Sequence, residues 1–276
     1  MSEIRFGCQT YTWQMSGKKY VGHLPHILRV VSDAGFAGLE PEVCMLGYYN
    51  QDASRLVDEL KRTGTVLGAL CLVCDWAGPG ETDAERAEAD RVIGYLRRFP
   101  ETLLALCQMP GADRSDLRER QTNAIACVNA VARRAAEGGI RSAFHPNSPP
   151  GSVFRTADDY ETLMSGLNGE AVGFAPDFGH IAKGGMDPVK TLEKYLPAVR
   201  HVHFKDMAKK GTWALMGRGV IDFRAIVARL RDAGYDGWIM VEDESPLAES
   251  DPDAATLENG KHVAESLRPL LGRQRG

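Results

Sequence analysis

Four strand-like segments of the sequence end in a side chain that can bind a divalent metal ion. They read Ala143-Phe144-His145, Ala175-Pro176-Asp177, His201-Val202-His203 and Met240-Val241-Glu242. Imidazole nitrogens and carboxylate oxygens together form a donor set that suits a divalent cation. A lone aspartate after a strand usually caps a helix, and a lone histidine is usually a hydrogen-bonded core residue. Because the four end successive strands, we predict one shared metal site.

Two of these segments contain a further polar side chain at a spacing that brings it to the same place. His201 and His203 lie two residues apart on one expected strand, so they share a face, and Lys205 shares it too. We predict that His203, which is nearer the carboxyl end, is the ligand, and that His201 supports it or packs. Asp177 is followed three residues later by His180, after a glycine that permits a tight turn. We predict Asp177 as a ligand and His180 as a contact to a substrate hydroxyl.

Short β-type runs alternate with helical patterns along the whole chain, and these elements would position the site. Leu24, Ile27, Leu28 and Val31, for example, recur at helical spacing. The alternation predicts parallel βαβ units and a single (β/α)8 TIM barrel, an α/β fold, over residues 1–276. Function in such a barrel lies at the carboxyl ends of the strands. The expected strands are residues 5–10, 38–40, 66–73, 103–108, 141–145, 172–176, 201–205 and 239–242.

A short internal repeat supports the barrel. Asp33–Gly38 and Asp232–Gly237 both read Asp-Ala-Gly, an aromatic residue, one variable residue and Gly. In each copy we expect a helix to end, the first glycine to take the left-handed conformation, and the next strand to begin. Each following strand ends in a carboxylate, Glu40 or Glu242.

The composition is that of an ordinary globular protein and excludes several classes of partner. Of 276 residues 43% are hydrophobic, and 33 basic against 37 acidic residues give a net charge of −4. No nucleic-acid partner is expected, because phosphate contacts require a basic face. No apolar run approaches the roughly 18 residues of a membrane span, and the first residues do not resemble a signal peptide. With only six cysteines we expect a cytoplasmic protein without a disulfide framework.

Motifs in the second half of the chain resemble those of the sugar isomerase/epimerase family, whose members are xylose-isomerase-like TIM barrels. The family includes tagatose 3-epimerases, hydroxypyruvate isomerases and inosose dehydratases. The resemblance covers residues 140–244 well and the N-terminal half only by its rhythm of strands and helices. The motifs are Phe174–His180, His201–Asp206, Gly217–Phe223, and Gly234–Trp238 leading to Glu242.

The resemblance implies one bound divalent ion, held by Glu, Asp, His and Glu on strands five to eight. Manganese is the expected ion, with cobalt, magnesium and zinc as alternatives. Asp177, His203 and Glu242 match three of the ligand positions. At the fourth, where the resembled epimerases have glutamate, this sequence has His145. His145 is closer to the histidine-rich segment of inosose dehydratases.

The resemblance implies proton removal next to the carbonyl of a keto sugar or inosose through a metal-stabilised enediolate. Epimerases of the family use two metal-bound glutamates on opposite faces of the substrate. With His145 in place of one of them, that residue is a ligand, a base or both, and Glu242 is the other acid/base group. We expect an isomerase or epimerase first and a dehydratase or lyase as the alternative. A β leaving group would decide between them.

Further residues are expected on the substrate side. Glu40 ends a strand and can contact a hydroxyl, and Arg218, between two glycines, can reach over the pocket. Trp13 and Trp76 follow strands and can form an apolar wall against a sugar, although such tryptophans more often pack between loop and barrel. The sequence leaves open whether the protein forms a homo-oligomer.

Two other classes of function remain to be distinguished. Apurinic endonucleases share this barrel, but they hold three zinc ions with a larger ligand set, and this chain has seven histidines and a net charge of −4. A metal-free binding or scaffolding barrel would contain no ion on elemental analysis.

Overall fold

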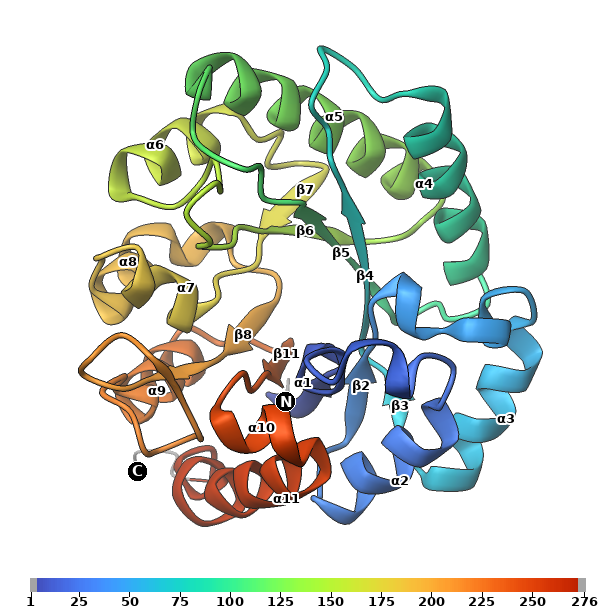
Figure 1. Ribbon diagram of the computed structural model, residues 1–276, viewed down its shortest axis with the longest axis vertical. Helices are drawn as coiled ribbons and strands as arrows, with labels where there is room; N and C mark the ends of the chain where they lie inside the picture. Colours follow the sequence, from blue (N-terminus) through green and yellow to red (C-terminus); the bar gives the residue numbers. More distant parts are fainter. Residues whose placement is uncertain (1–3, 273–276) are drawn as a thin grey trace.

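Eight parallel strands form the wall of a barrel in the computed structural model, which describes residues 4–272. Their order around the barrel follows the chain, and helices surround them (Figure 1). The strands are β1 (Arg5–Gln9), β2 (Gly38–Glu40), β4 (Ala69–Cys74), β5 (Leu103–Gln108), β6 (Ser142–His145), β7 (Val172–Phe174), β8 (Val202–Phe204) and β11 (Trp238–Val241). The predicted (β/α)8 barrel is confirmed.

The barrel consists of two hydrogen-bonded arcs that join at two seams. One arc runs β3-β2-β1-β11-β8, where β3 is Val66–Leu67, and the other runs β4-β5-β6-β7. A parallel bridge between Glu42 and Cys71 closes the first seam. A bridge between Asp177 and His203 helps close the second, so two predicted metal ligands lie side by side at a seam.

The outer layer consists of helices whose apolar faces pack on the strands. In α2, Leu24, Ile27, Leu28 and Val31 are all buried, as their spacing predicts. The helices are α1 (Tyr11–Gln14), α2 (Leu24–Asp33), α3 (Ala53–Thr63), α4 (Asp83–Leu96), α5 (Leu117–Glu137), α6 (Ala157–Gly166), α7 (Phe178–Lys183), α8 (Pro188–Tyr195), α9 (Phe223–Asp232), α10 (Pro246–Ser250) and α11 (Pro252–His262). Short helical turns lie at Gly17–Tyr20, Val43–Met45, Gly47–Asn50, Leu196–Ala198, Val263–Leu267 and Arg268–Leu270.

The strand expected at residues 66–73 is two strands that change partners at Gly68. The β3 strand pairs with β2, whereas β4 pairs with β5. The side chains of Trp238 and Met240 fill the space where a Cβ atom of Gly68 would stand. Only glycine therefore lets the chain pass between the two arcs at this point.

The repeated helix-to-strand joint has the predicted geometry. Gly35 and Gly234 follow α2 and α9 with φ angles of 78° and 73°, the left-handed conformation that favours glycine. A hairpin of β9 (Asp206–Met207) and β10 (Trp213–Ala214), which the sequence did not indicate, follows β8. Within residues 4–272 no helix is both long enough and apolar enough to span a membrane.

Candidate metal centre

The four predicted ligands converge at the carboxyl ends of four neighbouring strands. His145 is the last residue of β6, His203 lies in β8, and Glu242 follows β11 directly. Asp177 follows β7 and caps α7, where its Oδ1 accepts a hydrogen bond from the backbone N–H of His180 at 2.8 Å. One donor atom from each of the four residues lies within 4.8 Å of the others, and all four residues are buried.

The facing atoms of this cluster are short of partners. His145 Nε2 lies 3.6 Å from Asp177 Oδ2, and His203 Nδ1 lies 3.4 Å from Glu242 Oε2. His145 Nε2, Asp177 Oδ2 and His203 Nδ1 have no hydrogen-bond partner within residues 4–272. An unsatisfied buried polar atom costs about 1–3 kcal/mol. A divalent cation would satisfy all of them at once, so the donor set fits such an ion.

Two overlapping groups of potential ligands already contain hydrogen bonds or ion pairs, either among their members or with Lys205. His180, Glu242 and Glu244 also come together, but the Lys205 ammonium lies among them. Glu40, His201 and His203 form a third group, in which the Glu40 carboxylate is hydrogen-bonded to both imidazoles. The cluster of His145, Asp177, His203 and Glu242 is therefore the better candidate for an ion.

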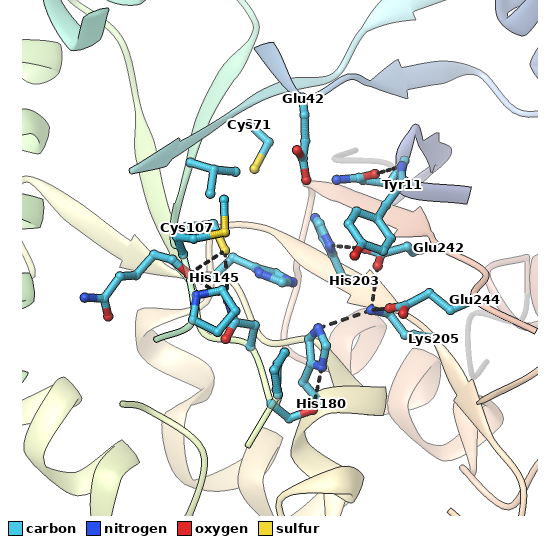
Figure 2. A pocket seen from close by; sticks show the side chains of 18 of the residues that line it. Tyr11, Glu42, Cys71, Cys107, His145, His180, His203, Lys205, Glu242 and Glu244 are labelled. Atoms are coloured by element: carbon cyan, nitrogen blue, oxygen red, sulfur yellow. Dashed lines mark hydrogen bonds and ion pairs between the residues drawn. The ribbon is translucent and has the colours of Figure 1, made fainter. Parts of the chain in front are cut away.

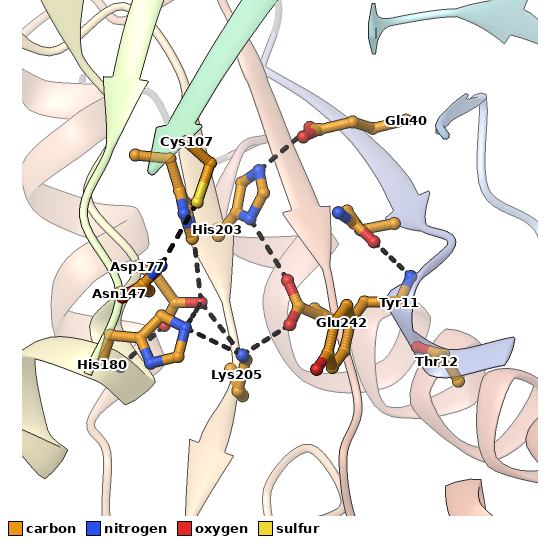
Figure 3. Close-up of polar contacts among 12 residues, drawn as sticks. Tyr11, Thr12, Glu40, Cys107, Asn147, Asp177, His180, His203, Lys205 and Glu242 are labelled. Atoms are coloured by element: carbon orange, nitrogen blue, oxygen red, sulfur yellow. Dashed lines mark hydrogen bonds and ion pairs between the residues drawn. The ribbon is translucent and has the colours of Figure 1, made fainter. Parts of the chain in front are cut away.

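Lys205 is the functional residue to which the sequence analysis gave no role. Its side chain is buried, and its Nζ lies 2.5 Å from both Glu242 Oε1 and Glu244 Oε1 and 3.7 Å from Asp177 Oδ2 (Figure 3). Burial alone would lower the pKa of Lys205, but the three carboxylates hold it well above its usual value. A fixed positive charge therefore lies beside the candidate metal centre. In the sequence, the only indication of a role for Lys205 was its expected position on the same strand face as His203.

His180 is held as a neutral imidazole at the cavity wall. Its Nε2 lies 3.1 Å from Lys205 Nζ, and its Nδ1 lies 2.7 Å from Ser148 Oγ. Burial and the charge of Lys205 lower the pKa of His180 to about 3. Because the ammonium can only donate, Nε2 accepts from Lys205 and Nδ1 carries the proton that is donated to Ser148. The predicted contact between His180 and a substrate hydroxyl stays a prediction.

The candidate metal centre opens into a cavity of about 530 Å³ (Figure 2). His145, His180, His203, Lys205 and Glu242 all line it. The lining also includes small or apolar residues of β4, β5 and the loops that follow β5 and β6: Cys71, Val73, Cys107, Met109, Pro110, Pro149 and Pro150. The volume is in the range of small-molecule binding sites.

A family model described as the xylose isomerase-like TIM barrel matches residues 28–268 of the chain. The chain belongs to the xylose isomerase-like TIM barrel family. The inosose dehydratase of Salmonella agona (strain SL483) is 30% identical over an alignment that covers 97% of this chain and 98% of the relative. The inosose dehydratase of Lacticaseibacillus casei is 29% identical, and its alignment covers 50% of that relative. The chain therefore spans about half the length of such relatives.

Two solved structures share the fold. The IolI protein with a bound zinc atom aligns with a TM-score of 0.77 at 15% identity, covering 97% of this chain and 98% of that one. D-psicose 3-epimerase in the presence of D-fructose aligns with a TM-score of 0.74 at 16% identity, covering 98% and 100%. The relatives are named inosose dehydratase, and the solved structures show that the barrel fold is shared.

Three residues considered as substrate contacts lie away from the cavity. Trp13 is buried, and its indole N–H donates to Asp253 Oδ1 at 2.8 Å, which directs the ring toward α11. Trp76 is likewise buried outside the lining. Arg218 is exposed beside a separate cavity near α11, because Asp206 accepts hydrogen bonds from the backbone N–H groups of the two flanking glycines and turns the loop outward. The expectation of Trp13 as a wall and Arg218 as a lid was therefore wrong.

Glu40 supports the candidate metal centre from below and does not face the substrate. Its Oε2 lies 2.6 Å from His201 Nε2 and 2.9 Å from His203 Nε2, and the residue is fully buried outside the cavity lining. The expected hydroxyl contact was wrong, whereas the supporting position expected of His201 is found. Burial alone would lower the pKa of His203, but the charge of Glu40, the contact with Glu242 and the hydrogen bond to Glu40 raise it to about 10. Glu40 accepts a hydrogen bond from His203 Nε2, and this contact orients the ring so that Nδ1 faces the cluster.

Replacing Glu40 with glutamine is expected to weaken binding of the divalent ion without removing a ligand. Loss of a group that orients a metal-binding histidine typically reduces metal affinity about 10–100-fold. Titration of the ion-free protein with Mn²⁺ or Zn²⁺ by calorimetry would measure the change in Kd. The matched control is Glu249→Gln, at an exposed glutamate of α10. An unchanged Kd in Glu40→Gln would contradict the supporting role.

Proposed function

We propose that the protein is a divalent-metal-dependent enzyme that removes a proton next to the carbonyl of a keto sugar or inosose. The observation that carries the proposal is the cluster of His145, Asp177, His203 and Glu242. Its unpartnered buried atoms face one another at the wall of a cavity large enough for such a substrate. Relatives named inosose dehydratase and a neighbour named D-psicose 3-epimerase support the substrate class.

The ion would supply Lewis-acid chemistry, polarising the substrate carbonyl and stabilising the negative charge that develops on its oxygen. Two imidazoles and two carboxylates accept manganese, zinc and cobalt more readily than magnesium, which prefers oxygen ligands. Manganese is our first choice, and the zinc atom in the IolI structure supports testing zinc beside it.

The residues of the chain divide the proton transfer among them. Burial alone would raise the pKa of Glu242, but the charge of Lys205 and the contact with His203 lower it. Glu242 is therefore an ionised carboxylate at neutral pH and can accept the proton from the substrate carbon. Lys205 provides a fixed positive charge at the same wall, and the neutral His180 accepts a hydrogen bond from it. The charge of Lys205 favours an electron-rich intermediate in the cavity.

Loss of water is the outcome we propose after proton removal, with epimerisation as the second candidate. The full-length match to an inosose dehydratase and the histidine at position 145 both favour water loss. The fold shared with D-psicose 3-epimerase favours the epimer. Both outcomes begin with the same enediolate.

A screen of the metal-loaded protein tests the shared first step. Ketoses, 3-keto sugars and inososes would be incubated in deuterated water with Mn²⁺, Zn²⁺, Co²⁺ or Mg²⁺ and followed by NMR. We expect either deuterium next to the carbonyl or an alkene product with at least one substrate. The ion-free protein is the control. If no substrate exchanged or reacted while a duplex with an abasic site was cleaved, the endonuclease function would replace this proposal.

Variants of His145 are expected to separate the two outcomes. An enzyme that eliminates water should lose that activity in His145→Ala and gain little from His145→Glu. An epimerase should tolerate the glutamate, because the two-carboxylate arrangement would then be restored. Wild type and both variants would be assayed on one keto sugar for water loss and for epimer formation. Full activity of His145→Ala in both assays would leave His145 with a packing role only.

A further inference from the structure

Proton removal by Glu242 leaves open which group completes the reaction. Loss of water from an enediolate needs an acid that can protonate the departing hydroxyl. His145 faces Asp177 across the candidate metal centre, and Lys205 is bound between two carboxylates. None of these groups is free to carry a proton to a leaving group elsewhere in the cavity.

A further carboxyl group, besides those of Glu242 and Glu244, enters the same cavity from another strand. Glu42 follows β2 by two residues and lines the cavity together with Glu242. Figure 2 shows its side chain entering beside Cys71, on the side away from Lys205 and His180. The two carboxyl groups thus reach the enclosed space from different strands.

The backbone and side chain of Glu42 are held in place. Its backbone N–H donates to Thr10 Oγ1 at 3.1 Å, and a parallel bridge joins it to Cys71 on β4. Gln14 Nε2 donates to Glu42 Oε2 at 2.9 Å, and the Cys44 thiol lies 3.5 Å from the same oxygen. Within residues 4–272 both side-chain hydrogen bonds go to Oε2, so Oε1 can contact a bound molecule.

The surroundings of Glu42 raise the pKa of its carboxyl group. Burial raises its pKa most, the hydrogen bond from Gln14 opposes this, and the charges of Glu242 and Glu40 raise it further. Its neighbours on β4 and β5 include the buried thiols of Cys71 and Cys107, whose own pKa values burial also raises. No cation pairs with Glu42 among the described residues.

We propose that Glu42 is the acid that donates a proton to the hydroxyl group leaving the substrate. This inference rests on the proposed function and adds the second proton transfer to it. Glu242 takes the proton from the carbon next to the carbonyl, and the electron pair of that bond forms the carbon–carbon double bond. The bond from the adjacent carbon to its hydroxyl oxygen breaks, and the proton of Glu42 converts the leaving hydroxyl to water. Solvent then reprotonates Glu42 and accepts the proton of Glu242, so the net change is the loss of one water.

The assignment predicts that Glu42→Gln uncouples the two proton transfers. Product formation should fall by about 10²–10⁴-fold, the usual effect of removing a positioned acid. Exchange of the substrate proton with deuterated water should persist, because Glu242 can still remove and return it. Both rates would be measured by NMR on the metal-loaded protein with the inosose or 3-keto sugar that wild type dehydrates. Metal content would be measured in parallel and should match wild type.

Two further variants make each outcome decisive. Glu42→Asp keeps an acid and should recover part of the product formation, whereas Glu258→Gln, at an exposed glutamate beside the separate cavity, should behave as wild type. Product formation by Glu42→Gln at the wild-type rate would overturn the inference and leave the proposed function standing. Loss of exchange together with product in a variant that retains its metal would also overturn it. Absence of both exchange and product in wild type would instead reject the proposed function.

Discussion

Asp177→Ala is expected to yield a protein that no longer retains a divalent ion. Asp177 Oδ2 is fully buried in the cluster and has no hydrogen-bond partner within residues 4–272, so it would contribute a bond to the ion. Asp177 Oδ1 also caps α7 through the backbone N–H of His180. Loss of such a cap typically costs about 0.5–2 kcal/mol. The variant should therefore lose both the ion and part of its free energy of unfolding.

Asp177→Asn separates these two effects. Asparagine is as good a helix cap as aspartate, so Oδ1 can still accept from His180 N–H and the stability of the ion-free protein should be close to wild type. The neutral amide nevertheless removes a negative charge and places an N–H₂ donor or a weak acceptor toward the ion. Elemental analysis and thermal unfolding with and without metal would measure both properties. A normal metal content in Asp177→Ala would contradict the ligand assignment.

The convergence of the four candidate ligands could be predicted from the sequence because it depends on two simple regularities. Side chains alternate along a strand, which puts His201, His203 and Lys205 on one face. The carboxyl ends of parallel strands in a barrel meet at one rim, which brings Asp177 to His203. Neither regularity requires knowledge of the loops.

The positions of the two glutamates after β2 could not be predicted in the same way. Glu40 is the last residue of its strand, and Glu242 directly follows its own strand. Glu40 nevertheless lies below the expected position of the ion, whereas Glu42 reaches the cavity. The difference arises from the stagger of neighbouring strands around the barrel, which sets the height of each strand end. The sequence offers only the spacing of two residues, which puts Glu40 and Glu42 on the same side of the chain.

The loop residues were predicted least well, because contacts between distant segments decide their direction. Trp13 points toward Asp253, which is 240 residues away in the sequence. Arg218 faces outward because the Asp206 carboxylate binds the backbone on both sides of it. An aromatic or basic residue after a strand therefore indicates a substrate contact only when the loop is known.

Glu242→Gln is expected to remove catalysis while the ion stays bound. The amide has nearly the shape of the carboxylate, and its oxygen can still face His203 and the ion, but it cannot accept the substrate proton. Deuterium exchange should therefore fall by about 10²–10⁴-fold. The affinity for the ion should change much less than in Asp177→Ala. Exchange rates by NMR and calorimetric titration with Mn²⁺ would measure the two quantities.

The matched control for this variant is Glu244→Gln. Glu242 and Glu244 both place an Oε1 atom 2.5 Å from Lys205 Nζ, but only Glu242 belongs to the four-residue cluster. Glutamine at either position would remove one of the ion pairs that hold Lys205. Only Glu242→Gln would also remove the proposed base. If Glu244→Gln slowed exchange as strongly, the essential feature would be the anchored ammonium, and the base would have to be another residue. If Glu242→Gln exchanged at the wild-type rate, His145 would be the next candidate, because it lies in the same cluster with an unpartnered Nε2.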